Sequence, residues 1–162
     1  MVTGRAQSRA RARPHPATRR GTPSRLTSGI GGLFVAFGAL GFLPGVTSDF
    51  GELGLAGHGS GALLLGAFQV SVLLNVLHIG FGALGLVLAR TAAGSRLFLL
   101  GGGACYLGLW LFGVAVGADT PANIVPLNGG DDWLHALVGG GMLALGALTT
   151  RSRPTSPPPP PR

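Results

Sequence analysis

Residues 63–88, which read LLLGAFQVSVLLNVLHIGFGALGLVL, decide the fold because they contain no Arg, Lys, Asp or Glu. Sixteen of them are Leu, Ile, Phe or Val. Each such residue favours the centre of a membrane helix by about 0.3 to 0.6 kcal/mol, which sums to about −7 kcal/mol before the polar residues are counted. A bilayer core about 30 Å thick needs about 20 apolar helical residues. The stretch therefore predicts a membrane-spanning helix, which we place at residues 61–89.

Three more apolar stretches accompany it, at residues 26–43, 97–117 and 132–149. They contain no charged residue apart from Asp132 at the start of the last one. The last stretch is the weakest, because its six Leu and Val residues are diluted by glycine and favour insertion by only about 3 kcal/mol. We therefore expect an all-α, polytopic integral membrane protein with four transmembrane helices within residues 26–150.

The composition of the whole chain supports a membrane location. Of its 162 residues, 46% are hydrophobic and 10% are charged, whereas soluble domains carry about 25% charged residues. Cys105 is the only cysteine, which excludes a disulfide scaffold. Residues 1–25 hold seven arginines without hydrophobic periodicity, and residues 151–162 are rich in proline. Both ends are expected to be tails, the first disordered and basic and the second extended.

Charge is distributed unequally along the chain. Arg90 and Arg96 flank the short link between the second and third stretches, and the other basic residues lie in the two tails. The acidic residues lie in the other two links. The positive-inside rule therefore predicts that both termini are cytoplasmic, an N-in/C-in arrangement. All 12 basic residues are arginine and 30 residues are glycine, which suggests a bacterial source and hence a multi-pass protein of the inner membrane.

The net charge of +7 comes from basic residues that the positive-inside rule already explains. Nucleic acid is therefore not an expected partner. The expected partner is the lipid bilayer, with the Arg-rich tail on anionic cytoplasmic lipid at about 1 kcal/mol for each arginine near the surface.

An alternative interpretation of residues 26–43 is that they form a signal peptide that is cleaved off. Basic residues precede this stretch, and Val46, Thr47 and Ser48 resemble a cleavage site.

Small residues at helical spacing predict close helix packing, because helices in lipid associate through backbone approach and hydrogen bonds. The third stretch carries two such pairs and the fourth carries a ridge of three residues. One interpretation is packing inside a single bundle, and the other is the interface of a homo-oligomer. The residues concerned are Ala104, Gly108, Gly113, Gly117, Ala136, Gly140 and Ala144.

Polar residues of the second stretch lie on one helix face. Ser71, Asn75 and His78 stand at i, i+4 and i+7, followed by Gly82 and Gly85 at i+11 and i+14. Polar groups in lipid are costly unless they are paired, so this seam is either structural glue or the site of an ion, proton or ligand. In the fourth stretch, Asp131 or Asp132 is expected to cap the helix just before an interfacial tryptophan, Trp133.

His78 and His135 suggest a haem with paired axial ligands, but their depth argues against it. A helix that enters at residue 63 places His78 about 20 Å deep, whereas His135 lies one turn, about 5 Å, into its own helix. The spacing of Asp131, Asp132 and His135 matches no dedicated metal motif. We therefore expect no metal and no cofactor. No nucleophile elbow, phosphate loop or paired C-x-x-C is present, so the sequence indicates no enzyme class.

Two segments are similar to those of a known family. The stretch FQVSVLLNVLH at residues 68–78, with Gly82, Gly85 and Leu86, resembles the second membrane helix of small, mainly actinobacterial proteins grouped as domain of unknown function 4383. The segment PLNGGDDWLH at residues 126–135 resembles the signature that introduces the last helix of that family. The resemblance covers about residues 27–149.

The chain departs from the family pattern in two places. The family carries a histidine at the position of Leu74 and an asparagine near the position of Ser71. The resemblance implies a four-helix membrane protein without an assigned activity. The positions that would carry any shared role are Asn75, His78, Asn128, Asp131 and His135.

The leading functional hypothesis is a non-enzymatic structural or interaction module of the bacterial inner membrane. The alternative is a small transporter or a proton- or ion-conducting protein that uses the face of Asn75 and His78. A membrane enzyme ranks third, because only His135 with Asp131 or Asp132 offers acid–base groups.

Overall fold

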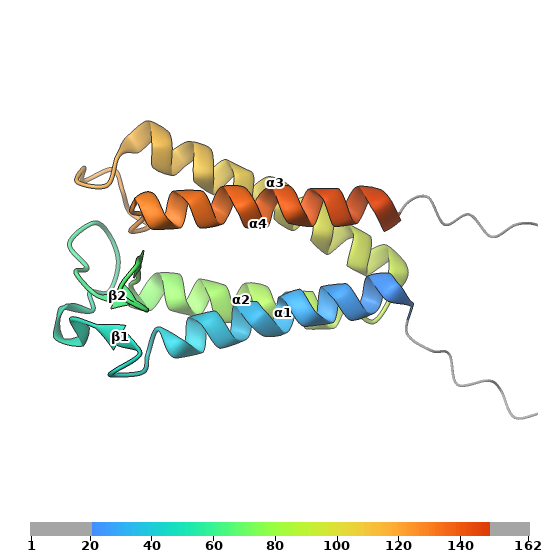
Figure 1. Ribbon diagram of the computed structural model, residues 1–162, viewed down its shortest axis with the longest axis horizontal. Helices are drawn as coiled ribbons and strands as arrows, with labels where there is room; N and C mark the ends of the chain where they lie inside the picture. Colours follow the sequence, from blue (N-terminus) through green and yellow to red (C-terminus); the bar gives the residue numbers. More distant parts are fainter. Residues whose placement is uncertain (1–20, 150–162) are drawn as a thin grey trace, which may run out of the picture.

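The computed structural model describes residues 21–149, which form four helices and one small sheet. The helices are α1 (Thr22–Leu40), α2 (Val72–Leu88), α3 (Ala92–Val116) and α4 (Gly129–Leu148). Figure 1 shows them side by side, with the start of α1 and the end of α4 at the same end of the bundle. The prediction of four helices is confirmed, and the fold is mostly helical, with a small sheet that the all-α prediction did not include. The predicted tails lie mainly outside the described residues.

The first helix begins earlier than the sequence predicts. Residues 22–25, which we assigned to the tail, belong to α1. A proline stands in the first turn of α1, where its missing N–H costs nothing and its fixed φ favours the helix. Arg25 is therefore part of the bundle.

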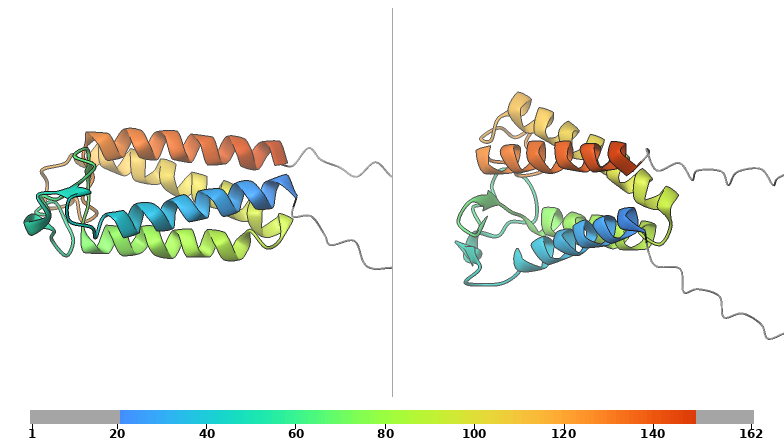
Figure 2. Two further views of the ribbon diagram at one scale, coloured as in Figure 1. Left: turned by 60° about the horizontal axis from the view of Figure 1, so that its bottom comes forward. Right: turned by 45° about the vertical axis from the view of Figure 1, so that its right-hand side comes forward.

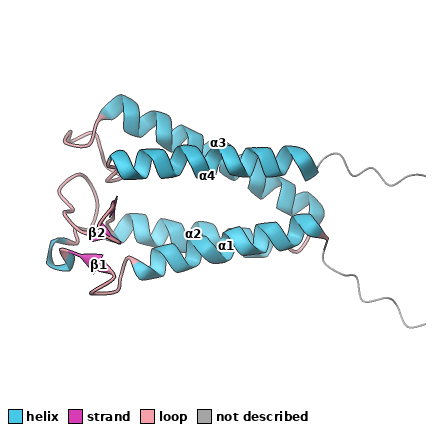
Figure 3. Ribbon diagram, in the orientation of Figure 1, coloured by secondary structure: helices cyan, strands magenta, loops and turns pink. Residues whose placement is uncertain are grey.

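The other end of the bundle carries a cap, residues 41–71, built from short strands and loops (Figure 3). Strands β1 (Thr47–Ser48), β2 (Leu63–Leu64) and β3 (Phe68–Gln69) form an antiparallel sheet in that order, and η1 (Phe50–Glu52) is a 3₁₀ turn. Leu64 pairs with both Thr47 and Phe68. The cap has its own small core, in which the buried residues Ala62, Leu64 and Val70 pack against partly buried residues that include Phe37 and Leu40 of α1.

The cap corrects the prediction of a helix over residues 61–89. Residues 61–71 form β2, β3 and the turn between them, in which Leu65 and Gly66 have φ values of 54° and 68°. The helix begins only after Ser71, whose hydroxyl accepts a hydrogen bond from Leu74 N at 3.1 Å. Of the apolar residues before it, Ala62, Leu64 and Val70 are buried in the cap core, whereas Leu65 in the turn is exposed. Apolar content indicates burial, but it does not distinguish a helix from a buried strand.

The helices pack as two hairpins, α1 with α2 and α3 with α4, as the views of Figure 2 show. Glycines meet where each hairpin crosses. A Cβ added at Gly31 would lie 2.8 Å from Gly82 O, and one added at Gly103 would lie 2.9 Å from Gly139 O. Any side chain at these positions would push the backbones apart.

Most of the small residues that the sequence singled out lie elsewhere. Gly113 is buried, with the Asp132 carboxylate against its Cα. Ala136 is half-buried. The remainder are exposed and do not pack inside the bundle, because the crossing points fall on other faces of α3 and α4; they are Ala104, Gly108, Gly117, Gly140 and Ala144.

An aromatic core joins the two hairpins. Phe34 of α1 has its ring centroid 5.0 Å from those of both Phe81 in α2 and Tyr106 in α3. Phe98 of α3 and Met142 of α4 complete this buried cluster. One helix of the described part, α3, is long and apolar enough to cross a membrane, and α2 is apolar but shorter.

Candidate functional site

Three ring-bearing side chains from three helices come together below the cap. They are His78 of α2, Tyr106 of α3 and His135 of α4. The ring centroid of Tyr106 lies 6.4 Å from that of His78 and 5.1 Å from that of His135. Both histidines are candidates on the sequence alone, whereas Tyr106 is not, although it is the only tyrosine of the chain.

The two histidines lie at the same level of the bundle, which corrects the predicted difference in depth. His78 is the seventh residue of α2, and His135 is the seventh residue of α4. Both helices begin at the cap, so each imidazole lies about 10 Å along its helix. The expected separation arose from the early start assigned to the second helix. The depth argument against a haem shared by the two rings therefore no longer applies.

The hydrogen bonds of the three rings leave polar groups unused. His78 Nδ1 lies 2.9 Å from Leu74 O. A carbonyl only accepts, so Nδ1 carries the hydrogen and Nε2 keeps its lone pair. His135 Nδ1 is buried and has no partner among residues 21–149. The Tyr106 hydroxyl likewise makes no hydrogen bond with any described residue.

These rings form part of a half-open groove of about 540 Å³ between α2 and α3. Leu74, His78, Tyr106 and His135 are buried lining residues, whereas Val76, Leu77 and Leu84 line it from exposed positions on α2. Cys105 is exposed at this groove. The volume lies in the range of small-molecule sites.

The rest of the polar seam is closed by α1. The structure buries Ser71, Asn75 and His78, as their helical spacing predicts. Neither amide atom of Asn75 has a hydrogen-bond partner among the described residues, and Gly41 at the end of α1 lies directly against this amide. The Asn75 side chain is thus packed between two helices.

The start of α4 is tied to the cap by a capping box. Asn128 Oδ1 accepts from Asp131 N at 3.0 Å, and Asp131 Oδ2 accepts from Asn128 N at 3.0 Å. The same Oδ2 also accepts from Gln69 N of β3 at 3.0 Å, and Asn128 Nδ2 donates to Ala67 O. The capping role expected of Asp131 or Asp132 therefore falls to Asp131.

Asp131 is the third residue of α4, and the backbone N–H groups of Asn128 and Gln69 both donate to its Oδ2. Asp132 has one buried carboxylate oxygen without a described partner, beside Gly113.

The loop between α3 and α4 depends on a residue that the sequence analysis did not select. Asn123 is buried, its Nδ2 donates to Ala118 O and Leu127 O, and its Oδ1 accepts from Leu127 N. An asparagine between Pro121 and Pro126 is the signal that would have indicated a structured turn. Within the described part of the chain, no group of three or more His, Cys, Asp or Glu residues is arranged to hold a metal ion.

Comparison with known proteins identifies the family. The model of a family described as a domain of unknown function, DUF4383, matches residues 25–148. No curated protein and no solved structure matches the chain significantly. The matched region contains α2, α3, α4, the cap and the groove, and all of α1 after its first three residues. The chain therefore belongs to the DUF4383 family.

Proposed function

We propose that the chain is a four-pass protein of the bacterial inner membrane that serves as a structural or interaction module. The observation that carries this proposal is the exposure of large apolar side chains on every helix. Leu33 of α1 and Leu137 of α4 are 71% and 74% exposed, and Leu84 of α2 and Leu111 of α3 are also exposed. Soluble monomers rarely expose apolar surface on this scale, whereas lipid tails are its natural solvent.

The lengths of the helices agree with this proposal. They contain 19, 17, 25 and 20 residues in chain order. At about 1.5 Å per residue they measure roughly 26 to 38 Å, close to the thickness of a bilayer core. The shorter α2 begins under the cap, which covers its first turn.

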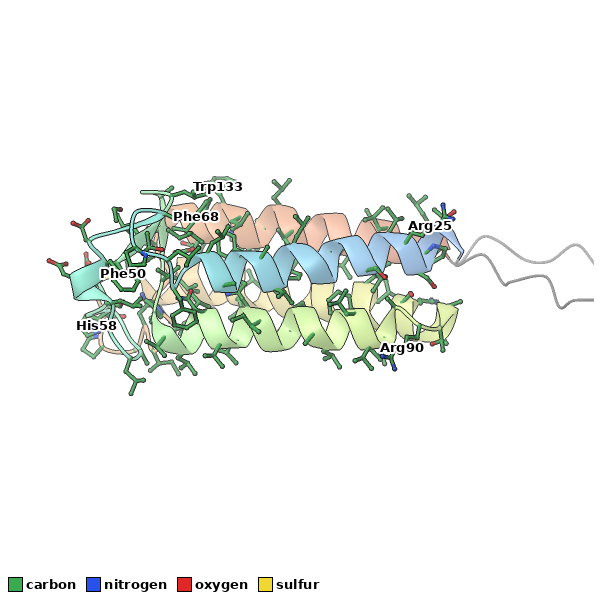
Figure 4. All side chains as sticks on the ribbon, turned by 90° about the horizontal axis from the view of Figure 1, so that it is seen from below. Arg25, Phe50, His58, Phe68, Arg90 and Trp133 are labelled. Carbon is green, nitrogen blue, oxygen red and sulfur yellow. The ribbon has the colours of Figure 1, made fainter. Side chains whose placement is uncertain are left out.

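The charged residues of the bundle support one orientation. Figure 4 shows Arg25 and Arg90 at the end where the tails begin, and His58 and Trp133 near the other end. The five acidic residues lie in the cap, in the α3–α4 loop or in the first turn of α4. The positive-inside rule then favours a cytoplasmic side at Arg25 and Arg90, with the cap outside and Trp133 at the outer interface.

The packing of the polar seam favours a structural role over conduction. An ion or proton path along Asn75 and His78 needs water or a chain of polar partners. Instead, Gly38 and Gly41 of α1 lie against Asn75, and the ring centroid of Phe37 lies 5.1 Å from that of His78. These contacts fill the face that the alternative function would use.

Labelling of single cysteines tests the proposed topology. In a Cys105→Ser background, His58→Cys and Arg90→Cys place one thiol at each end, both at exposed positions. A membrane-impermeant maleimide applied to intact spheroplasts should label His58→Cys and should label Arg90→Cys only after permeabilisation. Labelling of both positions without permeabilisation, or release of the protein by carbonate washing, would contradict the proposal.

The Arg-rich tail adds a proposed contact with anionic lipid. Its first 20 residues lie outside the described part of the chain. A peptide of residues 1–25 should bind vesicles containing phosphatidylglycerol and lose this binding as salt is raised, because screening weakens each arginine contact. A peptide with the seven arginines replaced by glutamine is the matched control. Equal binding of both peptides would remove this part of the proposal.

A further inference from the structure

The groove between α2 and α3 is apolar at its entrance and polar at its floor. Its outer positions, Val76, Leu77 and Leu84, are apolar and about half exposed. Its floor, formed by His78, Tyr106 and His135, is polar and nearly inaccessible. Small-molecule sites are lined mainly by apolar residues, with a few polar groups that orient the ligand. An apolar entrance of this kind suits a ligand that arrives through an apolar phase with its polar part first.

The floor offers hydrogen-bonding capacity that the protein does not use itself. His135 is 2% exposed, and its Nδ1 has no partner among the described residues. The Tyr106 hydroxyl is without a hydrogen bond in the same part of the chain, and His78 presents the acceptor Nε2. Buried polar groups are nearly always paired in folded proteins, so the buried, unpaired Nδ1 of His135 indicates a ligand that pairs with it, beside two further polar groups that the protein does not use.

The chemistry of the lining restricts the class of ligand. None of the described residues that line the groove is Arg, Lys, Asp or Glu, so a charged headgroup would be buried there without a counter-charge. The walls are rich in rings, and the centroids of Phe81 and Tyr106 lie 5.4 Å apart. Such a site suits a flat ring with an oxygen substituent, because the ring packs against aromatic faces.

We propose that the groove binds an uncharged, lipid-soluble ring compound of the phenol or quinone class. A carbonyl oxygen of the ligand accepts hydrogen bonds from the Tyr106 hydroxyl and from an N–H of His135, and a ligand hydroxyl can also donate to Nε2 of His78. The apolar substituent leaves the groove along Val76, Leu77 and Leu84. A cavity of about 540 Å³ accommodates such a ring and the first part of a chain. Entry from the bilayer rests on the proposed membrane location, whereas the fit to the cavity does not.

The test measures saturable binding of radiolabelled decylubiquinone to the full-length protein, both in nanodiscs and in detergent micelles. Empty nanodiscs and protein-free micelles correct for partitioning. Decylbenzene, which has the same tail and a ring without oxygen, is the matched probe for the head. The quinone should bind saturably and at least about tenfold more tightly than decylbenzene in both media. Absence of saturable binding, or equal binding of the two probes, would overturn the proposal.

Variants assign the binding to the floor. Tyr106→Phe removes one hydroxyl and His135→Phe removes an imidazole while a ring remains, and each should weaken binding about three- to tenfold. Cys105→Trp fills the groove from an exposed position and should abolish binding without a change to the floor. Leu97→Ala, at an exposed position that does not line the groove, should bind normally. Unchanged binding in Cys105→Trp and Tyr106→Phe would overturn the assignment.

Two further results separate this proposal from its competitors. A Soret band in the purified protein that disappears in His78→Ala would assign the groove to haem and overturn the proposal. Binding in micelles combined with cysteine labelling from the wrong side would leave the site standing and remove the proposed topology. Cysteine labelling from the expected side without quinone binding would support the proposed topology and overturn the proposed binding site. Helical circular dichroism of each variant shows that the fold is retained.

Discussion

The contacts within the hairpins and the contact between them are built from opposite kinds of residue. Within α1–α2 and α3–α4, glycines let the backbones touch at Gly31 and Gly82 and at Gly103 and Gly139. Between α2 and α3, large rings such as Phe81 and Tyr106 hold the helices apart. Glycine contacts exclude any ligand, whereas ring contacts leave a groove beside them. The same bundle thus has two closely packed hairpins and, between α2 and α3, a groove with room for a small molecule.

The largest effect is expected for Gly82→Ala, which tests the α1–α2 crossing. Its new Cβ would lie 2.5 Å from Gly31 O and 2.6 Å from Val35 N, both backbone atoms that cannot rotate away. The free energy of unfolding should fall by more than about 3 kcal/mol, measured by thermal or denaturant unfolding in detergent. Gly80→Ala in the same helix meets nothing within 4 Å and should be stabilising by up to about 1 kcal/mol. Equal behaviour of the two variants would contradict the proposed role of the crossing.

The second crossing should respond in the same direction but less strongly. A Cβ at Gly139 would lie 2.9 Å from both Gly103 O and Leu107 N, which is a milder overlap. Gly139→Ala should lower the free energy of unfolding by about 1 to 3 kcal/mol. The neighbouring Gly140→Ala, whose new methyl group meets nothing within 4 Å, is the control. A loss of stability in Gly140→Ala alone would instead point to contacts outside the monomer.

The smallest effect is expected for Tyr106→Phe, which tests the contact between α2 and α3. The hydroxyl has no hydrogen bond within the described residues, and phenylalanine keeps the ring contacts with Phe34, Phe81 and His135. Stability without ligand should change by less than about 0.5 kcal/mol. Tyr106→Ala removes the ring itself and should cost about 3 kcal/mol or more. A large loss in Tyr106→Phe would show that the hydroxyl has a structural partner.

The sequence alone was sufficient to predict the number and approximate position of the helices. The third and fourth were expected at residues 97–117 and 132–149, and they are Ala92–Val116 and Gly129–Leu148. Long apolar stretches without charge have few alternatives to helix in lipid. The common face of Ser71, Asn75 and His78 and the family of the chain were also readable from local patterns.

Tertiary structure decided where α2 begins and which residues meet. Residues 61–71 are as apolar as a helix requires, but pairing of Leu64 with Thr47 and burial of Val70 direct them into the cap. That later start brings His78 level with His135 and creates the site around Tyr106. Small residues at the predicted spacing, such as Ala104 and Gly108, remain exposed, because the crossing point of two helices selects the contact face. Composition and periodicity describe one segment at a time, whereas these outcomes depend on contacts between segments distant in the chain.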